Sequence, residues 1–178
     1  KVIIGMCYPC KDGRGTPKQC EWKKFDWGQV DGVDMDFSKR EHRVIAAKWY
    51  VDEVIRRYSE QSYENFDLVG LYCTEENLYA IGDIITEIND YIHSKGLKNY
   101  WIPYWNNNDQ YALKWADYHF DLAWRQPNYF FYNNDGSLPK KSQLKECIRN
   151  SKYFGLGLEL EFETSGTSNG LHEVSASM

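Results

Sequence analysis

Three carboxylates are spaced two residues apart near the end of the sequence, in the stretch FGLGLELEFE at 154–163. Glu159, Glu161 and Glu163 alternate there with apolar residues. Successive side chains of a β-strand point to opposite faces, so the stretch predicts a strand with one apolar and one acidic face. We interpret the apolar face as packed on helices and the acidic face as directed into the mouth of a barrel. The alternative is a solvated strand with a charged outer face.

A further acidic side chain, Glu76, ends another apolar stretch, DLVGLYCTEE at 67–76. If this stretch is a regular strand, Tyr72 and Glu76 share a face. Glu75 is expected in the first turn of the following helix, where the macrodipole favours an acidic residue. Two carboxylates across a cleft are typical of glycoside hydrolysis, in which one protonates the leaving oxygen and the other attacks the anomeric carbon or activates water. The sequence therefore predicts Glu76 as the acid and Glu161 as the nucleophile.

Arg125 is the expected partner of Glu159, which lies one layer deeper in its strand than Glu161 and needs a compensating charge when buried. The arginine would also keep Glu161 ionised, as a nucleophile requires, whereas aromatic surroundings favour the neutral form of Glu76. The sequence therefore favours a retaining mechanism, with the two carboxyl groups about 5–5.5 Å apart. The alternative is a purely structural ion-pair network of Glu159, Glu161 and Arg125.

Further candidate ligand-binding residues lie at the ends of the predicted strands. In a parallel α/β fold the carboxyl ends of the strands lie on one face, where ligands bind. Tryptophan and tyrosine offer flat apolar faces with a polar tip, which suits sugar rings. The predicted substrate-binding residues are Tyr72, Trp105, Arg125, Gln126, Asn128, Tyr129, Glu159 and Glu163.

The elements that would position these residues alternate along the chain. Apolar runs predict strands at 2–9, 67–74, 99–105, 120–126 and 154–163. Helical spacing predicts helices at 38–58, 81–92, 109–116 and 140–150. Ser38 and Glu41 form a capping box at the start of the first helix. Pro103 is expected near the end of its strand because it lacks a backbone donor, and Gly155 and Gly157 indicate close approach of another group.

This alternation implies an α/β fold with a parallel sheet and crossover helices. No glycine-rich phosphate motif follows the first strand, which disfavours a dinucleotide-binding fold. About five β/α units are expected, whereas a closed barrel has eight units and about 250 residues. We therefore predict a single domain over 1–178, a partial TIM-type barrel that lacks its first and last units. A small open α/β sheet is the alternative.

Composition and charge disfavour several other functions. The formal net charge is −5, and no run of lysine and arginine is long enough to form a patch, which argues against a nucleic-acid partner. No apolar run approaches the length of a membrane span. The odd number of cysteines, five, argues against a complete disulfide framework. Cys7 and Cys10 are spaced C-x-x-C but have no second pair to complete a zinc site, so we expect neither a metal nor another cofactor.

Four motifs, GLYCTEENL, YWIPYW, FDLAWRQPNYFF and GLGLELEFE, together resemble an uncharacterised bacterial family, domain of unknown function 4855. The resemblance extends from the first strand to Glu163, and it implies a larger glycosidase-like barrel, often exported, of which this chain is an internal piece. Cys73 stands where an aromatic residue is common in the family. If two strands precede Lys1, Glu76 ends the fourth strand and Glu161 the seventh, which resembles the acid/base and nucleophile positions of the large clan of retaining glycosidases.

Two functions remain open on the sequence. The first is a glycoside hydrolase that acts through Glu76 and Glu161. The second is a non-catalytic carbohydrate-binding or scaffold barrel, whose acids only hydrogen-bond hydroxyl groups. The expected partner is a carbohydrate in both cases. The sequence does not indicate a compartment, and export or a cell-surface position follows from the resemblance only.

Overall fold

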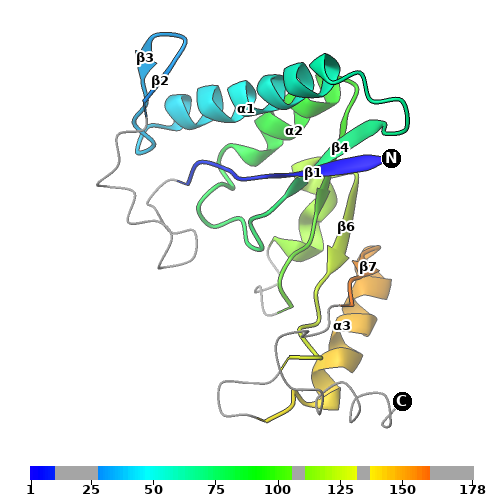
Figure 1. Ribbon diagram of the computed structural model, residues 1–178. Helices are drawn as coiled ribbons and strands as arrows, with labels where there is room; N and C mark the ends of the chain where they lie inside the picture. The colour runs from blue at the N-terminus through cyan, green and yellow to red at the C-terminus, as the bar shows by residue number, and fades with distance from the viewer. Residues whose placement is uncertain (11–27, 106–110, 132–136, 161–178) are drawn as a thin grey trace.

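A parallel sheet of five strands forms the centre of the computed structural model, which describes residues 1–10, 28–105, 111–131 and 137–160 (Figure 1). The strands are β1 (Val2–Met6), β4 (Leu68–Cys73), β5 (Lys98–Trp101), β6 (Leu122–Arg125) and β7 (Gly157–Leu158). They lie side by side in sequence order, and each neighbouring pair is parallel. The predicted α/β class with a five-stranded parallel sheet is therefore confirmed. The described residues form no closed barrel.

Helices connect these strands, and a small hairpin precedes the first helix. The helices are α1 (Arg40–Glu60), α2 (Ile85–Ser94), η2 (Ala112–Tyr118) and α3 (Lys141–Phe154), and the antiparallel hairpin pairs β2 (Gln29–Val30) with β3 (Val33–Asp34). The third predicted helix is not an α-helix but a 3-10 helix, interrupted at Lys114 by non-helical backbone angles. Its N-cap Tyr111 and its aromatic residues Trp115 and Tyr118 pack against the core, so tertiary contacts outweigh the helical spacing of the sequence.

The predicted capping box at the start of α1 is wrong. The N-cap of α1 is Lys39, which makes no side-chain capping hydrogen bond. The hydroxyl of Ser38 instead donates to the Asp36 carboxylate at 2.6 Å, and the Ser38 N–H donates to the same oxygen at 3.0 Å. Asp36 thus occupies both donors of Ser38 in a local turn, a competition that is common for aspartate and serine near helix ends.

The core lies between one face of the sheet and the helices α1 and α2. Leu71, Cys73 and Trp101 from the sheet have no exposed surface, and they belong to one cluster with Val51 of α1 and Ile88 of α2. Leu71 and Cys73 alternate with half-buried Tyr72, as expected for a strand with one face on the core. Burying a large apolar side chain of this kind stabilises the fold by about 1.5–3 kcal/mol.

The other face of the sheet carries a different set of side chains. Strand register places Gly5, Tyr72, Tyr100 and Leu122 in one row across β1, β4, β5 and β6. The side chain of Leu122 is 49% exposed, although it lies on a strand inside the sheet. In a barrel this face would line the interior, where neighbouring strands fill the space with side chains.

The strand predicted at 154–163 begins later than expected, because α3 continues through Phe154. Gly155 follows the helix in the left-handed conformation, with φ +69°, and the Leu156 N–H returns to the Ser151 carbonyl at 2.9 Å. Gly157 begins β7 beneath the ring of Trp124, where an added Cβ would lie 2.1 Å from a ring carbon. The close approach predicted from glycine is confirmed at Gly157, whereas Gly155 ends a helix.

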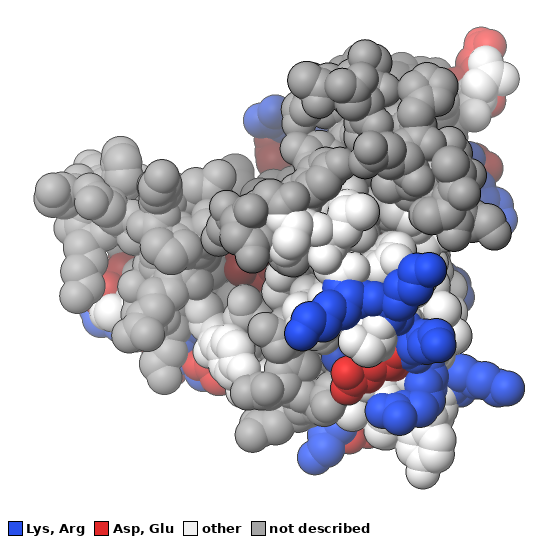
Figure 2. All heavy atoms as spheres, turned by 90° about the horizontal axis from the view of Figure 1, so that it is seen from below, with Lys and Arg blue, Asp and Glu red and all other residues white. Residues whose placement is uncertain are grey.

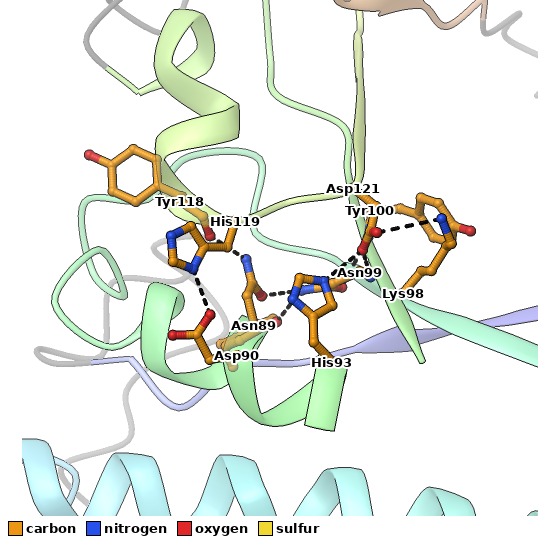
Figure 3. A network of polar contacts seen from close by, with 10 residues as sticks. Asn89, Asp90, His93, Lys98, Asn99, Tyr100, Tyr118, His119 and Asp121 are labelled. Atoms are coloured by element: carbon orange, nitrogen blue, oxygen red, sulfur yellow. Dashed lines mark hydrogen bonds and ion pairs between the residues drawn. The ribbon is translucent and has the colours of Figure 1, made fainter. Parts of the chain in front are cut away.

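A polar network ties α2, β5 and β6 together on the helix side of the sheet (Figure 3). The buried Asn99 amide donates to the Asn89 side-chain oxygen at 2.5 Å and to the Tyr8 hydroxyl at 2.9 Å. Asn89 in turn donates to the Tyr118 carbonyl at 2.7 Å. Buried polar groups are costly when unpaired, so these mutual bonds explain why two asparagines can occupy the core.

Asp121, which precedes β6, joins this network at a strand start. Its carboxylate accepts the Asn99 backbone N–H at 2.8 Å and lies 2.8 Å from Nε2 of His93 (Figure 3). Burial alone would raise the pKa of Asp121, but the hydrogen bonds from Asn99 and His93 outweigh it and hold this pKa below the ordinary value. The carboxylate therefore contributes stability above its ordinary pKa, and that stability is lost as pH falls through the lower pKa of the folded state.

We expect Asp121→Asn to lower the free energy of unfolding by about 1–2 kcal/mol at pH 7, because charge-assisted hydrogen bonds to the Asn99 N–H and His93 are weakened. Urea unfolding from pH 7 down to pH 3 should show the gap to the wild type narrowing as the wild-type carboxylate is protonated. The matched control is Asp90→Asn, which removes the exposed contact with His119 and should change stability little. A gap that is constant over this pH range would contradict the assignment.

Candidate functional site

The loops that follow β4, β5 and β6 are joined at the C-terminal edge of the sheet. The Tyr104 N–H donates to the Glu76 carbonyl at 3.2 Å, and the Gln126 N–H donates to the Pro103 carbonyl at 3.1 Å. Tyr104 and Gln126 also form a parallel bridge beyond the ends of their strands. We call residues 74–76, 104–105 and 125–129 the C-terminal edge. Pro103 lies just after β5, as its missing donor predicted.

Glu76 lies exposed at this edge, and its neighbour Glu75 is half-buried. The loop is held by the Glu75 carbonyl, which accepts the indole N–H of Trp101 at 2.6 Å. The expectation that Glu75 opens a helix is wrong, because α2 begins only at Ile85. The Glu75 carbonyl instead bonds to the core residue Trp101, and this bond fixes the position from which the Glu76 side chain projects.

Arg125 ends β6 with its side chain buried, and its guanidinium donates to the Trp105 carbonyl at 2.6 Å. Glu159 lies beside it, since the Glu159 N–H donates to the Arg125 carbonyl at 3.1 Å. The structure thus places Glu159, which directly follows β7, beside the end of β6, and the expected charge pairing with Arg125 stays a prediction. The positively charged side chain of Arg125 therefore lies between the loop after β5 and the strand β7.

Amide and aromatic side chains follow Arg125 in the same edge. The Asn128 amide lies 3.4 Å from the Tyr104 hydroxyl, and Gln126 is buried. Gln143 of α3 donates to the Pro127 carbonyl at 2.7 Å, so the helix anchors this loop. The ring of Tyr129 packs edge-on against that of Phe130. These contacts bring aromatic faces and amide donors together next to the loop that carries Glu76.

The predicted site residues therefore divide into three groups. The structure brings Glu159 next to Arg125, and it places on the C-terminal edge the residues Glu76, Trp105, Arg125, Gln126, Asn128 and Tyr129. Tyr72 lies deeper in β4, in register with Gly5 and Tyr100. Glu161 and Glu163 lie outside the described residues, so the predicted carboxyl separation stays a prediction.

Comparison with known families gives one match. The family described as domain of unknown function (DUF4855) matches residues 1–177. The chain belongs to this family. The resemblance inferred from the sequence motifs is thereby confirmed. No curated protein and no solved structure matches the chain.

Three cysteines of the DUF4855 domain lie close to the C-terminal edge, and sequence reasoning did not connect them with it. Cys10 is hydrogen-bonded to the Glu75 carboxyl. The Cys73 sulfur lies 3.8 Å from the Glu75 carbonyl oxygen, and the Cys7 sulfur lies 3.8 Å from the Thr74 hydroxyl. The C-x-x-C spacing indicated that Cys7 and Cys10 belong together. Their proximity to Glu75 could not be predicted, because Glu75 was expected in the first turn of a helix.

No group of three or more histidine, cysteine, aspartate or glutamate residues among the described parts of the chain could hold a metal ion. None of the helices in those parts is long and apolar enough to cross a membrane. These findings concern the described ranges, and the expectation that the domain needs no cofactor stays a prediction.

Basic side chains gather on the side of the domain that carries α3 (Figure 2). The exposed basic residues of α3 and its N-cap are Lys140, Lys141, Lys145, Arg149 and Lys152. Most are spaced three or four residues apart, so the helix brings them together although the sequence contains no long basic run. The sequence argument against a basic patch therefore does not hold at α3, while the absence of a nucleic-acid partner stays a prediction.

Proposed function

We propose that the DUF4855 domain is part of a glycosidase-like TIM-type barrel and acts on a carbohydrate through Glu76 and Glu161. The observation that carries the proposal is the hydrogen bond from the Tyr104 N–H to the Glu76 carbonyl, which lays the acid-bearing loop against an aromatic loop. Ligands of parallel α/β folds bind at this end of the strands. The sequential order of the five strands supports the barrel, since this is the order of a β/α barrel.

In this proposal Glu76 protonates the oxygen of the leaving sugar, and Glu161 attacks the anomeric carbon. Glu76 is exposed to an incoming ligand, and its backbone is fixed by Tyr104. In this proposal Glu161 extends the strand β7, and the buried charge of Arg125, which lies next to β7, then favours the ionised form of its carboxylate. An ionised nucleophile and a protonated acid are the pair that a retaining mechanism needs.

One observation favours the second candidate, a non-catalytic carbohydrate-binding or scaffold barrel. A general acid works best when burial raises its pKa toward the working pH. In this loop the more buried acid is Glu75, and burial raises the pKa of that carboxyl, whereas Glu76 is exposed. An exposed carboxylate at the edge can bind sugar hydroxyls without taking part in a reaction.

A panel of soluble and insoluble glycans, incubated with the protein, distinguishes the two candidates. For a hydrolase we expect release of new reducing ends from at least one glycan. For a binding module we expect retention on a glycan without any release, measured by affinity electrophoresis beside the reducing-sugar assay. Neither release nor retention on any glycan would contradict both candidates.

A further inference from the structure

Three cysteines and one glutamate lie in the neighbouring segments where β1 and β4 end. Cys7 and Cys10 follow β1 in the motif Cys–Tyr–Pro–Cys, while Cys73 ends β4 and Glu75 follows it. The parallel pairing of the two strands, with Met6 opposite Cys73, brings these segments together. Cys7, Cys10 and Cys73 carry thiols that form no disulfide in the structure.

The two cysteines of the motif have opposite environments. Cys7 is exposed, and its sulfur lies 3.8 Å from the hydroxyl of Thr74. Cys10 is buried, with its sulfur 3.5 Å from the Tyr8 carbonyl oxygen and hydrogen-bonded to the Glu75 carboxyl. An exposed thiol can react with a partner in solution, and a buried thiol three positions along the chain can resolve the mixed disulfide.

The carboxyl beside Cys10 is set to accept a proton. Burial raises the pKa of Glu75 above its ordinary value, the neighbouring charge of Glu76 raises it further, and the hydrogen bond with Cys10 lowers it in part. Its carboxylate is therefore a stronger base than that of an exposed glutamate. Burial also raises the pKa of the Cys73 thiol, which keeps this third sulfur protonated and unreactive.

We propose that Cys7 and Cys10 form a reversible dithiol–disulfide couple, with Cys7 as the attacking thiol and Glu75 as the base for Cys10. The C-x-x-C spacing is the arrangement of thiol–disulfide oxidoreductases, in which thiolates exchange with disulfides through a mixed disulfide. This site uses a different carboxylate from the proposed glycosidase pair. It does not depend on carbohydrate chemistry.

The reaction balances with a low-molecular-weight disulfide such as glutathione disulfide as the oxidant. The Cys7 thiolate attacks one sulfur of glutathione disulfide, so that its S–S bond breaks and one glutathione thiolate leaves. The Cys10 thiol then gives its proton to the Glu75 carboxylate and attacks the Cys7 sulfur of the mixed disulfide. The Cys7–Cys10 bond forms, a second glutathione thiolate leaves, and the two thiol protons end on the two glutathione molecules.

The test uses the whole reduced chain, mixed with glutathione disulfide, quenched with acid, alkylated and mapped by mass spectrometry. We expect a linked Cys7–Cys10 peptide that dithiothreitol reverses. In Cys10→Ser a glutathione adduct on Cys7 should persist. In Glu75→Gln the same adduct should accumulate, because ring closure slows roughly 100-fold without the base. Glu75→Asp should recover part of the rate.

Cys147→Ser provides the control, since this buried cysteine lies on α3 away from the cluster and should leave the reaction unchanged. Circular dichroism shows whether each variant is folded, and the pH dependence of ring closure in the wild type tests the base without any substitution. Absence of the Cys7–Cys10 link, or oxidation that joins either cysteine to Cys73 or Cys20 instead, would overturn the couple. Closure at the wild-type rate in folded Glu75→Gln would overturn the role of the carboxylate.

Discussion

Replacing Glu161 with Gln should abolish hydrolysis of every glycan that the protein cleaves, because no covalent glycosyl intermediate can form without the carboxylate. Replacing Glu76 with Gln should have an effect that depends on the leaving group. Natural glycans need a protonated leaving oxygen, so their cleavage should slow by about 100- to 10,000-fold. An aryl glycoside with an acidic phenol leaves without this proton, so its release should be largely spared. Rates on one natural and one nitrophenyl substrate measure the difference.

The matched control is Glu146→Gln, which removes an exposed carboxylate from α3 and should leave both rates unchanged. Nuclear magnetic resonance of the first product formed should show retention of the anomeric configuration. Inversion would assign Glu161 as a base that activates water, with the carboxyl groups farther apart. Full activity of Glu161→Gln would remove this residue from the mechanism altogether.

Much of the fold followed from periodicity. Alternating apolar runs separated by helical spacing predicted five parallel strands in sequential order, which the sheet shows. Boundaries were less accurate where a local interaction decided them. Asp36 takes the donors of Ser38, and α3 extends through Phe154 before Gly155 ends it. The exact end of a helix or strand thus depends on a single local contact, and the periodicity of apolar residues does not predict that contact.

The site was predicted to the extent that it depends on strand ends. The parallel sheet brings Glu76, Arg125 and Asn128 to one edge because they lie at the carboxyl ends of β4 and β6, and these ends meet on the same side of a parallel sheet. The orientation of Glu75 could not be predicted in the same way. Its backbone carbonyl accepts a hydrogen bond from the indole N–H of Trp101, and these two residues are 26 positions apart in the sequence. The high aromatic content of the chain indicates that aromatic side chains form part of the core. It does not predict that the indole N–H of Trp101 donates to the Glu75 carbonyl.

Gly70 is the position where a single added methyl group should damage both the fold and the site. A Cβ there would lie 2.4 Å from the Lys98 carbonyl oxygen and 2.8 Å from the ring of Tyr100. The oxygen belongs to the backbone of β5 and cannot turn away as a side chain can. We expect Gly70→Ala to separate β4 from β5 locally and to lower the free energy of unfolding by about 2–3 kcal/mol, the upper part of the range for overpacking.

Because β4 and β5 carry the loops of Glu76 and Tyr104, the same substitution should also weaken glycan retention or hydrolysis at temperatures where the protein is still folded. Gly5→Ala is the matched control, since it lies on the same face of the sheet and its Cβ would meet only the Thr74 methyl group at 3.3 Å. We expect this control to change stability by less than about 1 kcal/mol, because one side-chain methyl can shift by a few tenths of an ångström. Guanidinium unfolding of both variants measures the difference, and equal midpoints would show that the spacing of β4 and β5 does not depend on the missing side chain.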